Sequence, residues 1–102
     1  MNMRRPNPVF SDEYAAIREV VIDARRTARL SQAQLASRLG KANSHVALIE
    51  RGQRRIDSLE LYWIACNLGV APEALFERIA RKLDRLTGRG SIQSHPARTT
   101  SS

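Results

Sequence analysis

Three glycines divide the central part of the chain into short segments with a helical pattern. Gly40, Gly52 and Gly69 each follow directly on a stretch in which apolar residues recur at intervals of three and four. This spacing places the apolar residues on one face of an α-helix, whereas a strand needs a period of two, which no stretch sustains. Glycine ends a helix well because it readily adopts the left-handed conformation. The pattern therefore predicts an all-α fold built from short helices.

Signals at the ends of the apolar stretches predict five helices. Ser11, followed by Asp12 and Glu13, is a favourable start, because serine caps the first amides and acids suit the first turn. Ser31 caps the second helix in the same way, but the third begins after Ala42, which has no capping oxygen. The predicted helices cover residues 11–28, 31–39, 43–51, 58–68 and 71–86.

The 102 residues leave room for one domain, which we place at residues 11–86. Pro6 and Pro8 keep the start of the chain extended, so residues 1–10 are expected to form a flexible arm. Residues 87–102 are rich in Gly, Ser, Thr and Pro and are expected to form a disordered polar tail. The predicted fold is thus a single all-α domain with flexible N- and C-terminal tails.

The composition argues against several classes of protein. Cys66 is the single cysteine, so neither an intrachain disulfide nor a zinc site with His45 and His95 is expected, and Cys66 should pack as a small apolar residue. No apolar run reaches the ~20 residues of a membrane span and no secretory signal is present, so we expect a soluble, cytoplasmic protein. The sequence contains no nucleophile–base pair, carboxylate pair or phosphate-binding glycine loop. We therefore expect no enzyme activity, cofactor or small-molecule ligand.

Positive charge is concentrated in the middle of the chain. The protein has a formal net charge of +7, and residues 24–56 alone hold eight basic residues against one acid, Glu50, so that 8 − 1 = +7. Concentrated cations are typical of surfaces that bind nucleic-acid phosphates, because each neutralised phosphate releases a condensed counterion. We therefore expect a polyanionic partner, with a merely soluble basic surface as the alternative.

Residues 31–51 contain two short helices joined by a turn with Gly40, the arrangement of a helix-turn-helix. Apolar residues face inward from both helices, and the small Ala36 lets the helices cross closely. The residues expected to pack the pair together are Leu35, Ala36, Leu39, Val46 and Ile49. The residues left on the outer face of the second helix are Asn43, Ser44, Ala47, Leu48 and Arg51.

The segment LSQAQLASRLGKANSHVALIERGQRR, followed by RIDSLELYWIACNLGVAPEALF, resembles the helix-turn-helix domain of the XRE family, the phage lambda-repressor and Cro type. The resemblance covers roughly residues 13–78 and rests on the combination of Leu-Ser-Gln, Leu-Ala, Leu-Gly, Ile-Glu-Arg-Gly, Leu-Gly-Val and Leu-Phe. It implies a five-helix lambda-repressor-like domain. It also implies a transcriptional regulator that reads double-stranded DNA through the major groove.

The resemblance implies roles for individual residues. Asn43, Ser44, Ala47 and Leu48 occupy base-contacting positions, and Gln32, His45, Arg51, Arg54 and Arg55 occupy phosphate-contacting positions. An asparagine amide can pair with adenine N6 and N7, and guanidinium groups suit phosphates. A plain surface role is the alternative for each of these side chains. Leu48 departs from the polar or basic residue that most relatives carry, and either touches a thymine methyl group or packs on a neighbour.

Two further expectations come from the family pattern. Glu50 would repel DNA unless paired, and the matching acid in the family bonds an arginine of the first helix, so we expect a structural ion pair between Arg25 and Glu50. Arg29 stands where relatives commonly place the glycine that ends the first helix. Because arginine tolerates the left-handed conformation poorly, the helix is expected to run on or to end differently, with Arg29 gaining a phosphate contact.

Operators of this motif class are usually bound by two-fold dimers, so we expect a homodimer formed by the fourth and fifth helices. Leu75 and Phe76 are expected to close the core, and the interface residues are Trp63, Ile79, Leu83 and Leu86. The leading function is a repressor that acts on its own promoter through an inverted repeat. The alternative is an antitoxin, although the polar tail has little apolar surface with which to hold a toxin. Arg4 and Arg5 resemble a basic arm that wraps the duplex.

Overall fold

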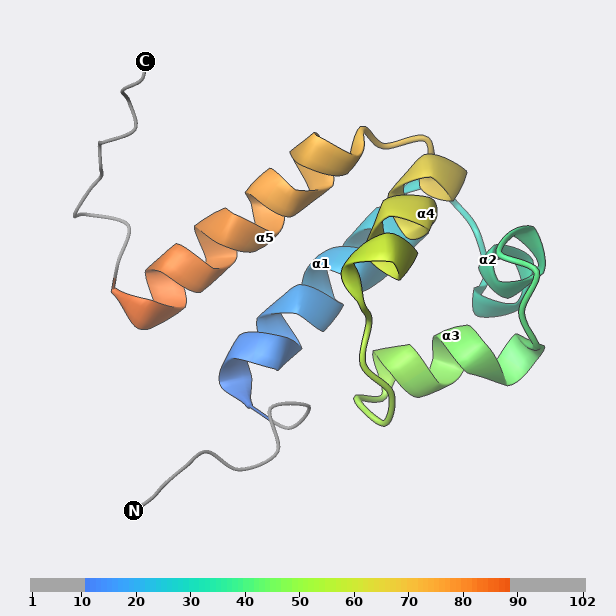
Figure 1. The fold of residues 1–102 in the computed structure, drawn as a ribbon, viewed down its shortest axis with the longest axis horizontal. Helices are drawn as coiled ribbons and strands as arrows, with labels where there is room; N and C mark the ends of the chain where they lie inside the picture. Colours follow the sequence, from blue (N-terminus) through green and yellow to red (C-terminus); the bar gives the residue numbers. More distant parts are fainter. Residues whose placement is uncertain (1–10, 89–102) are drawn as a thin grey trace.

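The computed structural model describes residues 11–88, which form five helices joined by short connections (Figure 1). The helices are α1 (Asp12–Thr27), α2 (Gln32–Arg38), α3 (Asn43–Glu50), α4 (Ser58–Leu68) and α5 (Pro72–Thr87). Residues 11–88 contain no strand, and the predicted all-α fold of five helices is confirmed. No helix in this range is both long and apolar enough to cross a membrane. The expected arm with Arg4 and Arg5, and the tail beyond Gly88, lie outside the described residues.

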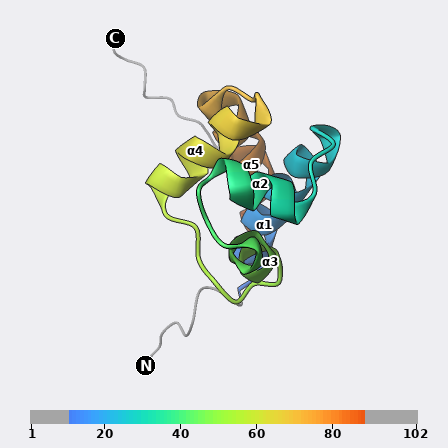
Figure 2. The ribbon, with the colours of Figure 1, turned by 90° about the vertical axis from the view of Figure 1, so that its right-hand side faces the viewer.

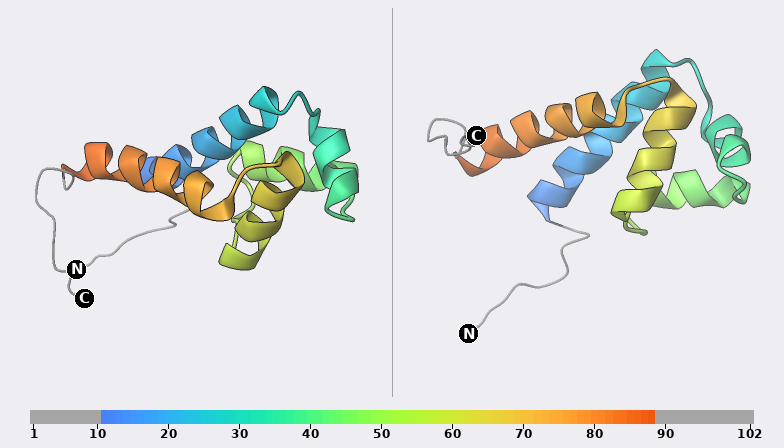
Figure 3. Two further views of the ribbon diagram at one scale, coloured as in Figure 1. Left: turned by 90° about the horizontal axis from the view of Figure 1, so that it is seen from above. Right: turned by 45° about the horizontal axis from the view of Figure 1, so that its top comes forward.

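The two longest helices, α1 and α5, lie side by side and run in opposite directions (Figures 1 and 3). α2 and α3 pack against each other, and α4 contacts both α2 and α5. α1 contacts α3 as well as α5, which joins the α1–α5 pair to the α2–α3 pair. α3 forms the outer edge of the domain, and Figure 2 shows it nearly end-on, with one side facing away from the other helices.

The apolar core draws residues from all five helices. Nine apolar residues have at most 1% of their surface exposed, namely Val21, Leu35, Ala36, Val46, Ile49, Ile64, Ala65, Leu75 and Ile79. The residues predicted to pack α2 against α3 are all buried or packed against this core. Helical periodicity alone therefore identified the buried faces of these two helices.

The helices start as their sequences predict. Ser11 and Ser31 accept hydrogen bonds from the backbone N–H groups of Tyr14 and Gln34, both at 3.0 Å. The cap at Ser31 is reciprocal, because the Gln34 side chain accepts a bond from the Ser31 N–H at 2.8 Å. α3 begins after Ala42, which makes no side-chain cap bond.

Helices α1 to α4 end in the same pair of backbone hydrogen bonds, a Schellman motif that requires one residue in the left-handed conformation. In α2, α3 and α4 a glycine occupies that position, as predicted. In α1 the residue is Arg29, with a φ of 61°. The expectation that α1 would run on or end differently at this arginine is therefore wrong.

Neighbouring residues hold Arg29 in this conformation. The Arg29 N–H donates to the Arg26 carbonyl at 2.9 Å, and the Leu30 N–H donates to the Arg25 carbonyl at 3.2 Å. The Arg25 guanidinium donates in turn to the Leu30 carbonyl at 2.7 Å, and the Leu30 side chain packs against the core. Together these contacts offset the roughly 1–2 kcal/mol that left-handed backbone costs a residue with a Cβ atom.

Three side chains lie elsewhere than predicted. Phe76 does not close the core but is 56% exposed, whereas Ile79 is 1% exposed and belongs to the core. α5 turns Ile79 and the residue four positions before it to the same inner face, so Phe76 faces outward. Cys66 does not pack as a small apolar residue, because it lies on the outer face of α4, where it is exposed.

We expect Arg29→Gly to raise the free energy of unfolding by about 0.5–1 kcal/mol, because relief of the Cβ clash exceeds the added freedom of the unfolded chain. Arg26→Gly is the matched control, since Arg26 is exposed within α1, where glycine costs about 1 kcal/mol. Urea denaturation measures both variants. Equal destabilisation by the two substitutions would contradict the conformation assigned to Arg29.

Candidate nucleic-acid interface

The outer face of α3 gathers the residues expected to contact bases. Ser44, Ala47, Leu48 and Arg51 recur at intervals of three and four and so share one face, opposite the buried apolar residues of α3. Asn43, Ser44 and Arg51 are exposed, and Ala47 and Leu48 are partly exposed. The structure thus brings these side chains together on one accessible surface. The small Ala47 at its centre allows a partner to approach the backbone of α3.

The beginning of α3 is also open to a partner. The N–H groups of Asn43 and Ser44 precede any carbonyl of α3 that they could bond, and Ala42 supplies no capping side chain for them, whereas the His45 N–H donates to the Ala42 carbonyl at 2.9 Å. These groups and the helix dipole place partial positive charge beside Asn43. The start of α3 therefore favours an anion over a cation.

A bidentate ion pair between Arg25 and Glu50 ties α3 to α1. Arg25 Nε lies 2.6 Å from Glu50 Oε2, and Arg25 Nη2 lies 3.0 Å from Glu50 Oε1. The side chains of Arg25 and Glu50 are 10% and 6% exposed, so both charges are largely removed from water. The pair expected from the sequence is thus present, in the parallel geometry that suits a guanidinium and a carboxylate.

Gln32, expected to contact a phosphate, has a structural partner as well. Its Nε2 donates to Glu50 Oε1 at 2.8 Å, so Glu50 accepts bonds from both α1 and α2. A side-chain amide carries two N–H groups, and the second leaves Gln32 able to donate to another acceptor. The negative charge of Glu50 is enclosed by these partners and does not lie on the outer face of α3.

His45 points away from the outer face of α3. Its Nε2 bonds the carboxylate of Glu60 on α4, and these two side chains are 12% and 11% exposed. Position 45 lies on the flank of α3 that faces α4, so the structure does not bring His45 together with the outer-face residues, and its phosphate contact stays a prediction. Glu60 was missed as a partner because 15 residues separate the two and no local pattern links them.

The loop between α3 and α4 presents two of the expected phosphate-contacting residues. Arg55 is exposed, and Arg54 is 45% exposed with its Nη2 3.9 Å from Glu60 Oε2. Tyr14 of α1 holds the loop, because its hydroxyl donates to the Ile56 carbonyl at 3.2 Å and accepts a bond from the Ile56 N–H. No local pattern predicts this contact, because its two residues lie 42 positions apart. Both arginines are thus displayed on a backbone fixed from α1.

The pairing of Arg25 with Glu50 leaves the rest of the charge in residues 24–56 positive. Seven basic side chains of this segment are exposed and no other acid occurs in it: Arg26, Arg29, Arg38, Lys41, Arg51, Arg54 and Arg55. α2, α3 and the loop that follows lie at one end of the domain (Figure 1), so much of this charge acts from one region and attracts polyanions. Residues 11–88 hold no cluster of His, Cys, Asp and Glu fit for a metal ion.

Comparison with known proteins places this geometry in a family. A family model described as helix-turn-helix matches residues 21–75. The solved structure of an XRE-family like protein from Pseudomonas syringae pv. tomato str. DC3000 is 32% identical, and the match covers 68% of this chain and 84% of that chain with a TM-score of 0.64. The chain belongs to the XRE family. It is a DNA-binding transcriptional regulator of the helix-turn-helix type, which confirms the resemblance found in the sequence.

More distant structures share the fold of this XRE-family chain. Two structures of the clp gene regulator ClgR from Corynebacterium glutamicum are 15% and 18% identical, with TM-scores of 0.65 and 0.62. The first match covers 76% of this chain and 83% of that chain, and the second covers 78% and 99%. At this identity the likeness shows the fold alone. No curated protein matches the sequence.

In this XRE-family protein Glu50→Gln is expected to lower the free energy of unfolding by about 3–5 kcal/mol, because the Arg25 guanidinium stays buried without its counter-charge. Glu77→Gln is the matched control: Glu77 pairs with Arg81 at 2.8 Å, but the side chains are 62% and 69% exposed. Loss of an exposed pair of this kind costs at most about 0.5 kcal/mol. Thermal and urea unfolding measure the stability of both variants. A free energy of unfolding for Glu50→Gln equal to that of the wild type would show that the pair is not structural.

Proposed function

We propose that this chain recognises a specific DNA sequence by inserting α3 into the major groove, with the arginines around α3 on the flanking phosphates. The observation that carries the proposal is the outer face of α3, where Asn43, Ser44 and Leu48 are accessible. No acid interrupts this face, because Glu50 is turned inward to Arg25. A major groove about 12 Å wide admits one helix with its side chains.

Sequence choice is assigned to the outer face of α3. Asn43 offers a donor and an acceptor that match adenine N6 and N7, and the Ser44 hydroxyl can donate to or accept from a neighbouring base edge. Leu48 is partly exposed, and its apolar side chain suits contact with a thymine methyl group. Ala47 lies among them and lets the helix approach the bases closely.

Affinity is assigned to the cations that frame α3. Arg55 is exposed, and the contact of Arg54 with Glu60 is long, at 3.9 Å. Arg51 Nε lies 3.4 Å from Gln53 Oε1, a weak hydrogen bond that a phosphate oxygen can replace. Such contacts fix the register of the protein on the duplex without reading its sequence. Gln32 adds a neutral donor to this group.

Asn43→Ala and Arg55→Ala separate the two roles. Asn43→Ala should weaken binding by roughly 1–3 kcal/mol on the operator alone, whereas Arg55→Ala should weaken all duplexes alike and reduce the salt slope by about one. The operator is first selected from a random pool of duplexes, and fluorescence anisotropy at several salt concentrations gives the affinities. Equal losses on operator and random DNA in both variants would end this division of roles.

The proposal includes a homodimer that binds an inverted repeat and represses its own promoter. α4 is apolar on both sides, because its inner face lies in the core and its outer face exposes Leu59, Tyr62 and Trp63 at 65%, 47% and 51%. These three residues of α4 are here called the outer patch, and Phe76 of α5 is exposed as well. A helix that is apolar all round is normally covered on both sides, and exposed aromatic residues favour protein interfaces.

The outer patch revises the interface expected from the sequence. Trp63 belongs to it, but Ile79 lies in the core, and Leu83 packs against the core. Leu86 remains available at the end of α5, where it is 48% exposed. The period of α5 explains the change, since the apolar seam past Leu75 is used to cover α1 and not a second chain.

Tyr62 contributes an uncharged surface to the outer patch. Its ring meets that of Trp63 edge to face, with centroids 5.0 Å apart and planes at 79°. Interaction with the Cys66 side chain, first through a hydrogen bond and then through charge, raises the pKa of the Tyr62 hydroxyl above its ordinary value of 10.0. A tyrosine with an ordinary or raised pKa is neutral at physiological pH, as suits an aromatic residue of an interface.

Tyr62→Glu is expected to convert dimers into monomers, because a carboxylate buried in an apolar interface has no partner. Thr27→Glu adds the same charge at an exposed position outside the outer patch and should leave association unchanged. Sedimentation at micromolar protein, with and without operator DNA, measures the oligomeric state. A wild-type chain that stays monomeric in both conditions would refute the homodimer.

A further inference from the structure

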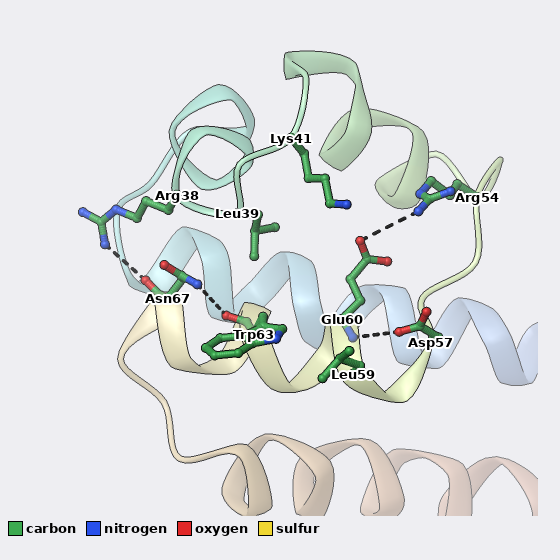
Figure 4. Close-up of a pocket in the computed structure, with 9 residues that line it drawn as sticks. All are labelled: Arg38, Leu39, Lys41, Arg54, Asp57, Leu59, Glu60, Trp63 and Asn67. Atoms are coloured by element: carbon green, nitrogen blue, oxygen red, sulfur yellow. Dashed lines mark hydrogen bonds and ion pairs between the residues drawn. The ribbon is translucent and has the colours of Figure 1, made fainter.

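A cavity of about 490 Å³ opens between the α2–α3 turn, the α3–α4 loop and α4 (Figure 4). Its volume lies within the ~300–1,000 Å³ typical of small-molecule sites. The side chains that matter for its chemistry are Leu39, Lys41, Arg54, Leu59, Glu60 and Trp63. The cavity lies beside α3 but none of the outer-face residues of α3 line it.

One wall of the cavity is apolar. Trp63 and Leu59 lie one turn apart on α4 and are 51% and 65% exposed, and Leu39 faces α4 from the end of α2 (Figure 4). Successive residues of a helix point in different directions, so Trp63 lines the cavity while Tyr62 does not. A partly exposed indole is a favourable surface for stacking a flat ring.

The acids of the cavity are already bonded. Asp57 caps α4 by accepting a hydrogen bond from the Glu60 N–H at 2.8 Å. The Glu60 carboxylate bonds His45 and lies 3.9 Å from Arg54, so its charge is shielded on the side of α3.

Lys41 differs from the other charged residues of the cavity. Its side chain extends from the α2–α3 turn toward α4 (Figure 4), and this side chain has no hydrogen bond or ion pair with any residue in the described range 11–88. An unpaired ammonium group opposite an apolar wall leaves the cavity suited to a molecule with an anionic end and a flat apolar end.

We propose that this cavity binds a small aryl carboxylate when the chain is monomeric, with its ring against Trp63 and Leu59 and its carboxylate toward Lys41 and Arg54. Because the proposed homodimer would cover Trp63 and Leu59, the ligand and the second chain exclude each other at this surface. The ring stacks on the indole, and the carboxylate supplies the counter-charge that Lys41 lacks. Arg54 can contribute because its contact with Glu60 is at the limit of an ion pair, at 3.9 Å.

A bound carboxylate would also act on DNA binding. It would neutralise Lys41 and Arg54, two of the exposed cations beside α3. The ligand should therefore weaken the hold on phosphates. This second step rests on the proposed function, whereas the binding step does not.

Trp63 is the single tryptophan of the chain, so its fluorescence reports on the cavity directly. We expect phenylacetate to shift this emission with a dissociation constant on the order of 1 mM, as suits a ligand of its size. Phenylacetamide and phenethylamine have the same ring with a neutral or a cationic end. Both should bind at least about three-fold more weakly, since neither supplies a negative charge to the exposed cations. Equal or tighter binding of either probe would overturn the assignment of an anion site.

Lys41→Gln tests the cation. It should weaken phenylacetate by about three-fold and leave phenylacetamide unchanged, and added salt should reduce the preference for the acid. Lys82→Gln is the matched control, because Lys82 lies on α5 and pairs with Glu19 at 3.2 Å, outside the cavity. Loss of phenylacetate binding in Lys82→Gln, or none in Lys41→Gln, would overturn the role of Lys41.

The effect on DNA is measured separately, by anisotropy with saturating phenylacetate against phenylacetamide at equal ionic strength. Weaker DNA binding with the acid supports the second step. Unchanged DNA binding in the presence of bound phenylacetate overturns that step, and an absence of DNA binding without any probe would instead refute the proposed function.

Discussion

The ion pair of Arg25 with Glu50 is the contact on which the DNA-binding surface depends. The guanidinium also donates a hydrogen bond to the Leu30 carbonyl, and the carboxylate also accepts one from the Gln32 amide. The first three helices and the turn between the first two therefore meet at one point. Apolar burial is non-directional and would hold α3 in place without fixing its orientation so closely. The same pair withdraws the one acid of the basic segment from the face that meets DNA.

Much of the fold was predictable because its signals are local. A serine at a helix start, a glycine at a helix end and an apolar period near 3.6 each act within a few residues, and the predicted bounds differ from the observed ones by one residue or so. This reasoning did not predict the left-handed conformation of Arg29. The preference of arginine against a positive φ is a local rule, and it was overridden by the Arg25 guanidinium and the packing of Leu30, which only the folded chain brings to that turn.

The candidate site was predicted in part. The outer face of α3 follows from its period, but the direction of His45 depends on Glu60, and the choice between Phe76 and Ile79 depends on how α5 crosses α1. Contacts of this kind join residues far apart in sequence, and composition or spacing says nothing about them. Charge counting had a similar limit, since it detected the basic segment but could not tell that Lys41 stands unpaired beside an apolar wall.

Tyr14 has a consequence for how the complex with DNA forms. Its hydrogen bonds to the Ile56 backbone fix the loop with Arg54 and Arg55 before DNA binds. Ordering one mobile residue costs about 1–2 kcal/mol, so a mobile loop would make the free energy of DNA binding less favourable by that amount for each residue ordered. In this protein the loop is already ordered when the chain folds. The arginines are therefore pre-organised for the phosphates. Less free energy is lost on binding, and the complex with DNA is expected to dissociate more slowly.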